Sequence, residues 1–185
     1  MTTPLHPRRL LRDAIVATLT GVTSAGARVT KTRRDPIRLQ DLPQISVYTL
    51  EETVDDASAL MAPRELTRST SIAVVAHVID ADSAPVDDAM DAIALEIETA
   101  MASNRYLSGT AGGHGAILTR TEIDILSSEN GDPIVGVIRL IYSATYYTLE
   151  VDPDPAVPFE RVGSTVQIAG SSPDNAPSEV FEITQ

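Results

Sequence analysis

The stretch ILTRTEIDILSSENGDPIVGVIRLIYSATYYT, residues 117–148, decides the fold. Two runs of alternating β-branched and aromatic residues flank the dipeptide Asn130-Gly131. Asn and Gly both tolerate the positive φ angles of a two-residue hairpin turn. The runs 117–128 and 133–148 are therefore predicted to pair as a long antiparallel ribbon.

The second run of this ribbon has two different faces, because successive side chains of a strand point to opposite sides. One face is predicted to carry Ile138, Leu140, Tyr142, Ala144 and Tyr146. The other face is predicted to carry Val137, Arg139, Ile141, Ser143, Thr145 and Tyr147. Nothing in the run looks reactive, so we expect the ribbon to supply sheet and interface rather than a catalytic platform.

Three further segments have the character of strands. The clearest is 66–81, which alternates in its first half and is apolar on both faces in its second half, IAVVAHVI. That pattern is typical of a central strand covered on both sides. The segment 44–51 has β-branched and aromatic content, and 27–34 alternates weakly. The lone His77 in the central strand is interpreted as a core or interface residue with satisfied hydrogen bonds rather than as a ligand.

The N-terminal segment 7–20 is predicted to be a helix. Its apolar residues recur at helical spacing, Pro7 suits the first turn, and Gly21 suits the stop. Asp13 and several threonines interrupt the apolar patch, so we interpret the segment as a helix and not as an export signal.

A second helix is predicted over 83–103, where Ser83 can cap the start and Pro85 fits the first turn. Its apolar stripe comprises Val86, Met90, Ile93, Ile97 and Met101. Three aspartates lie near its N-terminal end, at positions Asp87, Asp88 and Asp91. The helix dipole favours carboxylates there, so these residues are not interpreted as metal ligands.

Other segments are predicted to lie outside regular elements. The segment 51–66 lacks a clean period, and a loop of that length is usually functional or disordered. We interpret it as an arm that docks on a neighbour, with a mobile hairpin tip as the alternative. The glycine-rich segment 109–116 is interpreted as a flexible connector. Residues 149–185 hold five prolines, seven acidic residues and one arginine, which is typical of an appended tail.

The domain boundary follows from the change in composition. Residues 1–148 are predicted to form the α/β domain, and 149–185 an acidic, proline-rich C-terminal extension.

The net charge of −12 is unevenly distributed. Residues 1–38 carry eight basic and two acidic side chains, whereas 39–185 carry six basic and twenty-four acidic ones. An acidic body is a poor partner for nucleic acid, because phosphate contacts need Lys and Arg. A basic end on an acidic body suits head-to-tail contact between subunits, with ordinary solvated surface as the alternative.

Motifs for the common catalytic and binding chemistries are missing from the sequence. There is no cysteine, and the three histidines, His6, His77 and His114, are isolated. A G-x-S-x-G elbow and both glycine-rich phosphate motifs are absent. No apolar run approaches the roughly 18 residues of a membrane span. We therefore predict no catalytic residue, no metal, no cofactor and no membrane contact.

The order of these elements resembles the tail terminator (tail completion) proteins of long-tailed bacteriophages and prophages. The stretches that carry the resemblance are RRLLRDAIVATL, DLPQISVYTLEE, RSTSIAVVAHVID, DDAMDAIALEIETAM and LTRTEIDILSSENGDPIVGVIRLIYSATYYT. Together they span about residues 8–148. The match is one of order and spacing, and none of the stretches is a sharp motif with fixed catalytic residues.

The resemblance implies an α+β fold: a mostly antiparallel sheet with two main helices packed on one face, a long hairpin, and an extended loop or arm, followed by a C-terminal extension that lies outside the resemblance. It also implies a structural virion protein that is not an enzyme. Such proteins form a ring, hexameric in this family, on the head-proximal end of the tail tube. The ring ends tube polymerisation and offers a surface to a neck or head-completion protein, while DNA passes through it without specific binding. The expected location is the virion tail, with assembly in the host cytoplasm.

Two residue sets are candidates for these contacts, with plain solvated surface as the alternative for both. The set predicted for the subunit or tube interface comprises Arg28, Lys31, Arg33, Arg34, Arg38, Leu60 and Met61. The acidic set predicted for the lumen or ring surface comprises Asp55, Asp56, Glu122, Asp124, Glu129 and Asp132.

Two other functions stay open from sequence. The first is another neck, head–tail connector or tube-like phage protein. The second belongs to another class, a small hydrolase or ligand-binding α/β domain. That second reading predicts a monomer or dimer with a deep pocket around a perturbed carboxylate or His77.

Overall fold

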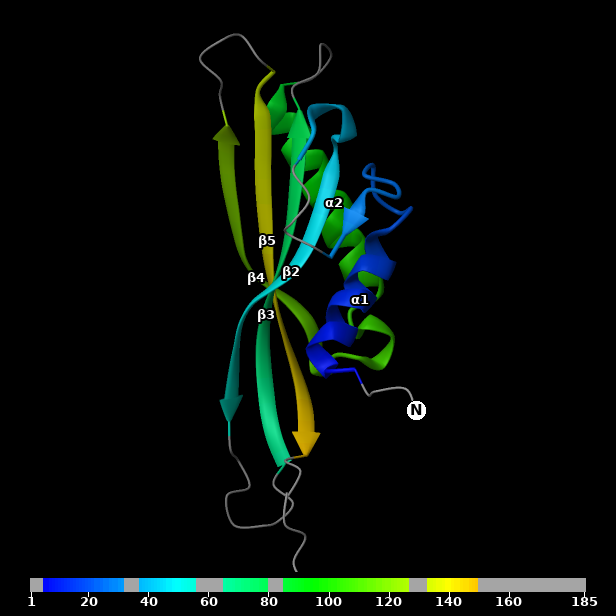
Figure 1. The fold of residues 1–185 in the computed structure, drawn as a ribbon, viewed down its shortest axis with the longest axis vertical. Helices are drawn as coiled ribbons and strands as arrows, with labels where there is room; N and C mark the ends of the chain where they lie inside the picture. Colours follow the sequence, from blue (N-terminus) through cyan, green and yellow to red (C-terminus); the bar gives the residue numbers. More distant parts are fainter. Residues whose placement is uncertain (1–4, 32–36, 56–64, 80–84, 127–132, 150–185) are drawn as a thin grey trace, which may run out of the picture. The chain divides into compact units, whose positions relative to one another are not determined.

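The computed structural model describes residues 5–31, 37–55, 65–79, 85–126 and 133–149 (Figure 1). All of them belong to one compact unit, Met1–Val151. The predicted C-terminal extension lies outside the described residues apart from Leu149, so the boundary between 148 and 149 stays a prediction.

The unit is built on one five-stranded sheet with the order β1-β2-β3-β5-β4. The strands are β1 (Val29–Thr30), β2 (Gln44–Asp55), β3 (Glu65–Ile79), β4 (Gly112–Leu126) and β5 (Val135–Leu149). Only the pair of β1 with β2 is parallel, and the other three pairs are antiparallel. The predicted ribbon is confirmed as the pair β4–β5, and its turn at 127–132 lies outside the described residues.

Two helices, α1 (Pro7–Leu19) and α2 (Val86–Ser103), lie on the same side of this sheet in Figure 1. This confirms the predicted fold class. Short 3-10 helices, η1 (Leu39–Asp41) and η2 (Leu107–Gly109), complete the regular elements. Pro7 occupies the start of α1 as predicted, and the backbone N–H of Arg8 donates to Nδ1 of His6 at 3.3 Å. Pro85 is the N-cap of α2 rather than a first-turn residue, and Ser83 lies outside the described residues.

The core lies between the helices and the sheet. The predicted apolar stripe of α2 is confirmed as buried, as is the predicted apolar face of β5. Helix and sheet approach closely at Gly136, where a Cβ atom would lie 2.7 Å from Cγ2 of Val86 and 2.8 Å from Sδ of Met90. The absence of a side chain at this position of β5 therefore lets the start of α2 pack against the sheet.

β3 is a central strand, as predicted. Among the described residues, the prediction that it is covered on both sides by other elements was wrong. The helices cover only the face that carries Ile72 and Val74. On the other face no described helix lies, yet Ala73 and Val75 are 0% and 3% exposed. They are flanked by longer side chains on β2 and β5, among them Tyr48 beside Ala73. Small residues in the middle of a sheet are thus buried by their strand neighbours alone.

Three predicted boundaries were wrong because strand pairing overrides local pattern. The predicted arm 51–66 is shorter, since β2 continues to Asp55 and β3 begins at Glu65. The predicted connector 109–116 contains the start of β4 at Gly112, which pairs with Thr145. The predicted strand 27–34 is reduced to Val29–Thr30 in the described residues.

Candidate functional site

Both edges of the sheet are open within the described part of the chain. β4 is the last strand at one edge, and β1 is the last at the other. Because β1 pairs only with Ile45 and Ser46, no described strand lies beside the outer edge of β2 from Val47 onward. Unpaired backbone N–H and C=O groups along such edges are ready to pair with another chain.

The edge strand β4 exposes large apolar side chains. Ile123 is 60% exposed, Leu126 is 54% exposed, and Ile117 and Ile125 are 41% and 44% exposed. The cause is the position of α2, which packs on β3 and β5 and leaves the outermost strand uncovered. A long, apolar, open edge is a hazard for a monomer and is typical of a surface that another chain covers.

Two residues of the predicted acidic set, Glu122 and Asp124, lie on this edge. Glu122 accepts a hydrogen bond from Nη1 of Arg139 at 2.6 Å and forms an ion pair with Arg120 at 2.7 Å. The bond to Glu122 is the main reason that the pKa of Arg139 is raised, although burial opposes it. Asp124 is exposed, and one of its oxygens accepts from the N–H of Ile125 at 2.9 Å.

A surface hollow of about 270 Å³ lies beside these residues, lined by Glu122, Ile123, Asp124, Val137 and Arg139. Sites for small molecules usually have volumes of about 300–1,000 Å³. Glu122 and Arg139 already bond to each other, and Asp124 accepts from the backbone N–H of Ile125, so the hollow offers little to orient a small ligand.

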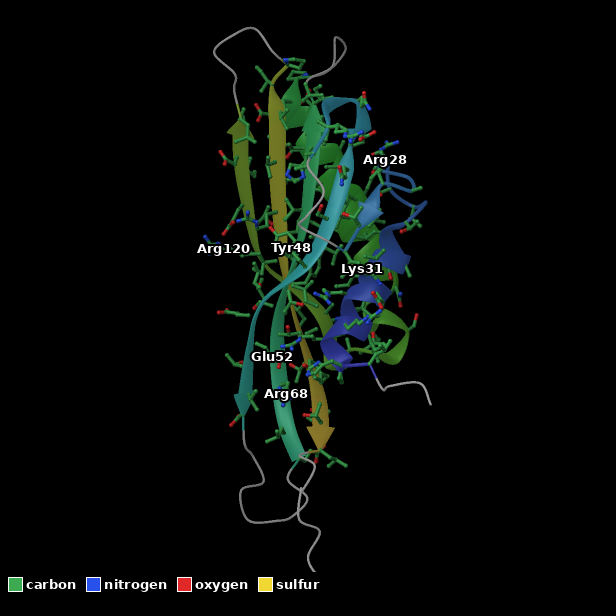
Figure 2. All side chains as sticks on the ribbon, in the orientation of Figure 1. Arg28, Lys31, Tyr48, Glu52, Arg68 and Arg120 are labelled. Carbon is green, nitrogen blue, oxygen red and sulfur yellow. The ribbon has the colours of Figure 1, made fainter. Side chains whose placement is uncertain are left out.

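The described members of the basic set lie toward the opposite edge. Nε of Arg28 donates to the carbonyl oxygen of Pro43 at 2.9 Å, and Lys31 pairs with Asp13 at 2.6 Å. Arg38 is exposed at the N-cap of η1. Figure 2 shows Arg28 and Lys31 on the β1 side of the sheet and Arg120 on the β4 side.

The structure therefore places Arg28 and Lys31 of the basic set toward one edge and Glu122 and Asp124 of the acidic set on the other, and it does not bring all acidic residues together. Asp55 lies at the end of strand β2 rather than in a loop, which corrects the prediction for this residue. The remaining candidates lie outside the described residues: Arg33, Arg34, Asp56, Leu60, Met61, Glu129 and Asp132.

A polar cluster around Glu52 was not predicted. Its carboxylate accepts hydrogen bonds from Nη1 of Arg68 at 2.8 Å and from the hydroxyl of Tyr146, and it lies 3.7 Å from Nη1 of Arg8. Nε of Arg68 also donates to Thr148 at 2.8 Å. The cluster joins the start of α1 to the end of the sheet where β2, β3 and β5 meet. The sequence could have revealed this cluster only through the strand register, which sets Arg68 opposite Tyr146.

The charges of this cluster shift two pKa values in opposite directions. Burial alone would raise the pKa of Glu52, but hydrogen bonds from Tyr146 and Arg68 and the charge of Arg8 outweigh it and lower this pKa. Burial, together with the bond to Glu52, raises the pKa of Tyr146. Glu52 is therefore held as a carboxylate and Tyr146 as a phenol.

His77 lies half-buried on the sheet face without helices, and its Nδ1 has no hydrogen-bond partner among the described residues. Burial and the nearby charge of Arg139 lower the pKa of His77. The half-buried position agrees with the predicted core or interface residue, but the unpartnered Nδ1 does not agree with the prediction that its hydrogen bonds are satisfied.

The described ranges contain neither a metal-binding cluster nor a membrane-spanning helix. No three His, Asp or Glu side chains in those ranges converge to hold a metal ion. None of the described helices combines the length and apolar character required to cross a bilayer.

Comparison with known proteins supports the fold. No family model matches the chain, and no curated protein matches it in sequence. Among solved structures, it is similar to the sheath/tube terminator of an extracellular contractile injection system, PVC, in the extended state. The TM-score is 0.52 with 18% identity, over 94% of this chain and 68% of that chain. At this identity the likeness shows that the two chains share a fold.

Proposed function

We propose that the chain is a terminator-type structural subunit of a tail-like particle. Copies of it form a ring, hexameric as the sequence resemblance implies, on the head-proximal end of a tail tube. The ring stops tube polymerisation and presents a surface to a neck or head-completion protein. DNA passes through its central hole, and the acidic balance of 39–185 disfavours specific DNA binding.

The observation that carries this proposal is the fold shared with a sheath/tube terminator. This shared fold agrees with the resemblance to tail terminator proteins, which rests on the order of elements in the sequence alone. The exposed apolar strand β4 supports the same conclusion, because a subunit that works inside an assembly needs surfaces that are complete only in the assembly.

The test is negative-stain electron microscopy of the purified protein, alone and mixed with tail tubes. A terminator forms rings that bind one end of each tube, and tube lengthening stops. A tube protein would polymerise by itself, and a neck or connector protein would leave tube lengthening unchanged. Light scattering that shows a compact monomer, with small-molecule binding, would instead favour a hydrolase or ligand-binding domain.

A further inference from the structure

The directions of the two edge strands are complementary. β1 runs parallel to β2, and each of the three steps from β2 through β3 and β5 to β4 is antiparallel. β1 and β4 therefore run in opposite directions. A second copy, related to the first by rotation about an axis roughly along the strands, brings its β1 antiparallel to β4 of the first.

Exposed apolar side chains lie on β4 and in the segments that lead into β1 and β2. On β4 they are Ile123, Ile125 and Leu126. Val22, between α1 and β1, is 65% exposed, and Ile37 and Leu39, which precede β2 in the chain, are 43% and 47% exposed. Contact between the two edges would bury apolar surface from both subunits, which is the main favourable contribution in most protein association.

The charges near the two edges have opposite sign. Arg28, Lys31 and Arg38 are exposed toward the β1 side, and Asp124 is exposed on β4. In sequence, 28–38 carries five basic residues and one acidic, whereas 120–132 carries one basic residue and four acidic. Among the described residues these charges are partly compensated on both sides, since Arg120 and Arg139 pair with Glu122, and Lys31 pairs with Asp13. Opposite charge on two edges of one chain favours head-to-tail contact between copies.

We propose that the β4 edge of one subunit binds the β1 edge of a second copy of this chain, so that neighbouring sheets join in one antiparallel ladder. The inference rests on the proposed ring and names the contact that closes it. It places Glu122 and Asp124 at the subunit interface rather than in the lumen. A second copy is the occupant because the chain itself supplies a partner edge of opposite direction and opposite charge.

Cross-linking between two single-cysteine variants tests the pairing, since the natural chain has no cysteine. Ala27→Cys lies just before β1 and Thr121→Cys lies on β4, and both positions are exposed. Within one subunit the two edges are four strand spacings apart, about 19 Å. A thiol cross-linker shorter than that separation can join the two positions only between subunits.

The expected result is a covalent dimer when the two variants are mixed in equal amounts, and little product from either variant alone. Dimers that form as readily from Thr121→Cys alone would show that like edges pair, and would overturn the inference. Rings in the microscope without the mixed dimer would overturn it while leaving the proposed function intact. No rings, with or without tubes, and no dimer would overturn both.

A charge placed on the apolar edge provides a second test. The double variant Ile123→Lys/Ile125→Lys should raise the protein concentration at which half the subunits are in rings by roughly tenfold or more. The matched control is Leu95→Lys, because Leu95 is 67% exposed on α2, away from both edges. Circular dichroism should show all variants folded. Rings of the double variant at the wild-type concentration would contradict the inference.

Discussion

Glu52 links the start of α1 to the end of the sheet, so its removal should lower the stability of the whole subunit. The side chain of Glu52 is 9% exposed and bonds Arg68 and Tyr146, with Arg8 nearby. One hydrogen bond to a charged group contributes about 1.5–3 kcal/mol, and the more exposed pair with Arg8 contributes about 0–1 kcal/mol. Arg68 keeps its bond to Thr148 after truncation. We therefore expect Glu52→Ala to lower the free energy of unfolding by about 2–3 kcal/mol.

The assay is urea unfolding at neutral pH followed by circular dichroism, with Glu51→Ala as the control. Glu51 is adjacent and exposed, and the contact it makes with Thr70 uses its backbone oxygen. The control should change the free energy of unfolding by less than about 0.5 kcal/mol. Equal midpoints and slopes for the two variants would refute the idea that Glu52 connects α1 to the sheet.

The pH dependence of the free energy of unfolding tests whether the charge of Glu52 provides this stability. The pKa of Glu52 is lower in the folded protein than its ordinary value of 4.5. Its contribution to stability is therefore complete above that ordinary value and is lost as the pH falls through the lowered folded value. The stability gap between wild type and Glu52→Gln should narrow as the pH falls below 4.5. A gap that stays constant in acid would show that the charge of Glu52 is not what stabilises the contact.

Three further predictions concern the core and the predicted basic segment. Tyr142→Phe should leave the free energy of unfolding unchanged or raise it by about 1 kcal/mol, because the buried hydroxyl has no described hydrogen-bond partner; a clear loss in urea unfolding would contradict this. Gly136→Ala should cost about 1–3 kcal/mol in the same assay, because the new methyl group meets Cγ2 of Val86 at 2.7 Å; wild-type stability would show that α2 shifts freely. Charge reversal at Arg33 and Arg34 should impair ring assembly while circular dichroism is unchanged, and full assembly would exclude both residues from the interface.

The ribbon and both helices could be predicted because their signals are local. The alternation in 117–148 and the stripe of α2 each follow from the geometry of a single element. The extension of β2 through 51–55 could not be predicted. Residues 51–55 belong to the strand only because they pair with the first half of β3. Such pairing depends on contacts between distant segments, which no short pattern contains.

The candidate site also combines features that follow from local patterns with features that depend on contacts between distant segments. The hairpin signal alone predicted that Glu122 and Asp124 share one strand. It could not predict that this strand is an edge, or that Arg28 and Lys31 lie toward the other edge. That relation depends on the strand order, in which β1 pairs with β2 and β4 with β5. The Glu52 cluster was missed for a related reason, since its partners come from three elements far apart in sequence.

The proposed edge pairing also gives a physical reason for a structure that ends growth. A subunit whose two edges fit each other can form an open polymer or a closed ring, depending on the rotation between neighbours. Closure covers the part of β4 that meets β1 of the neighbouring subunit, so the hazard created by the exposed β4 is reduced once the ring is complete. Lateral contacts are then used up within the ring, and what is left for other proteins is the two faces at its ends. If one of those faces fits the tube and the other does not, the tube stops at the ring. The β4–β1 contact and the end of polymerisation would then have a single cause, and the Ile123→Lys/Ile125→Lys variant should lose both together.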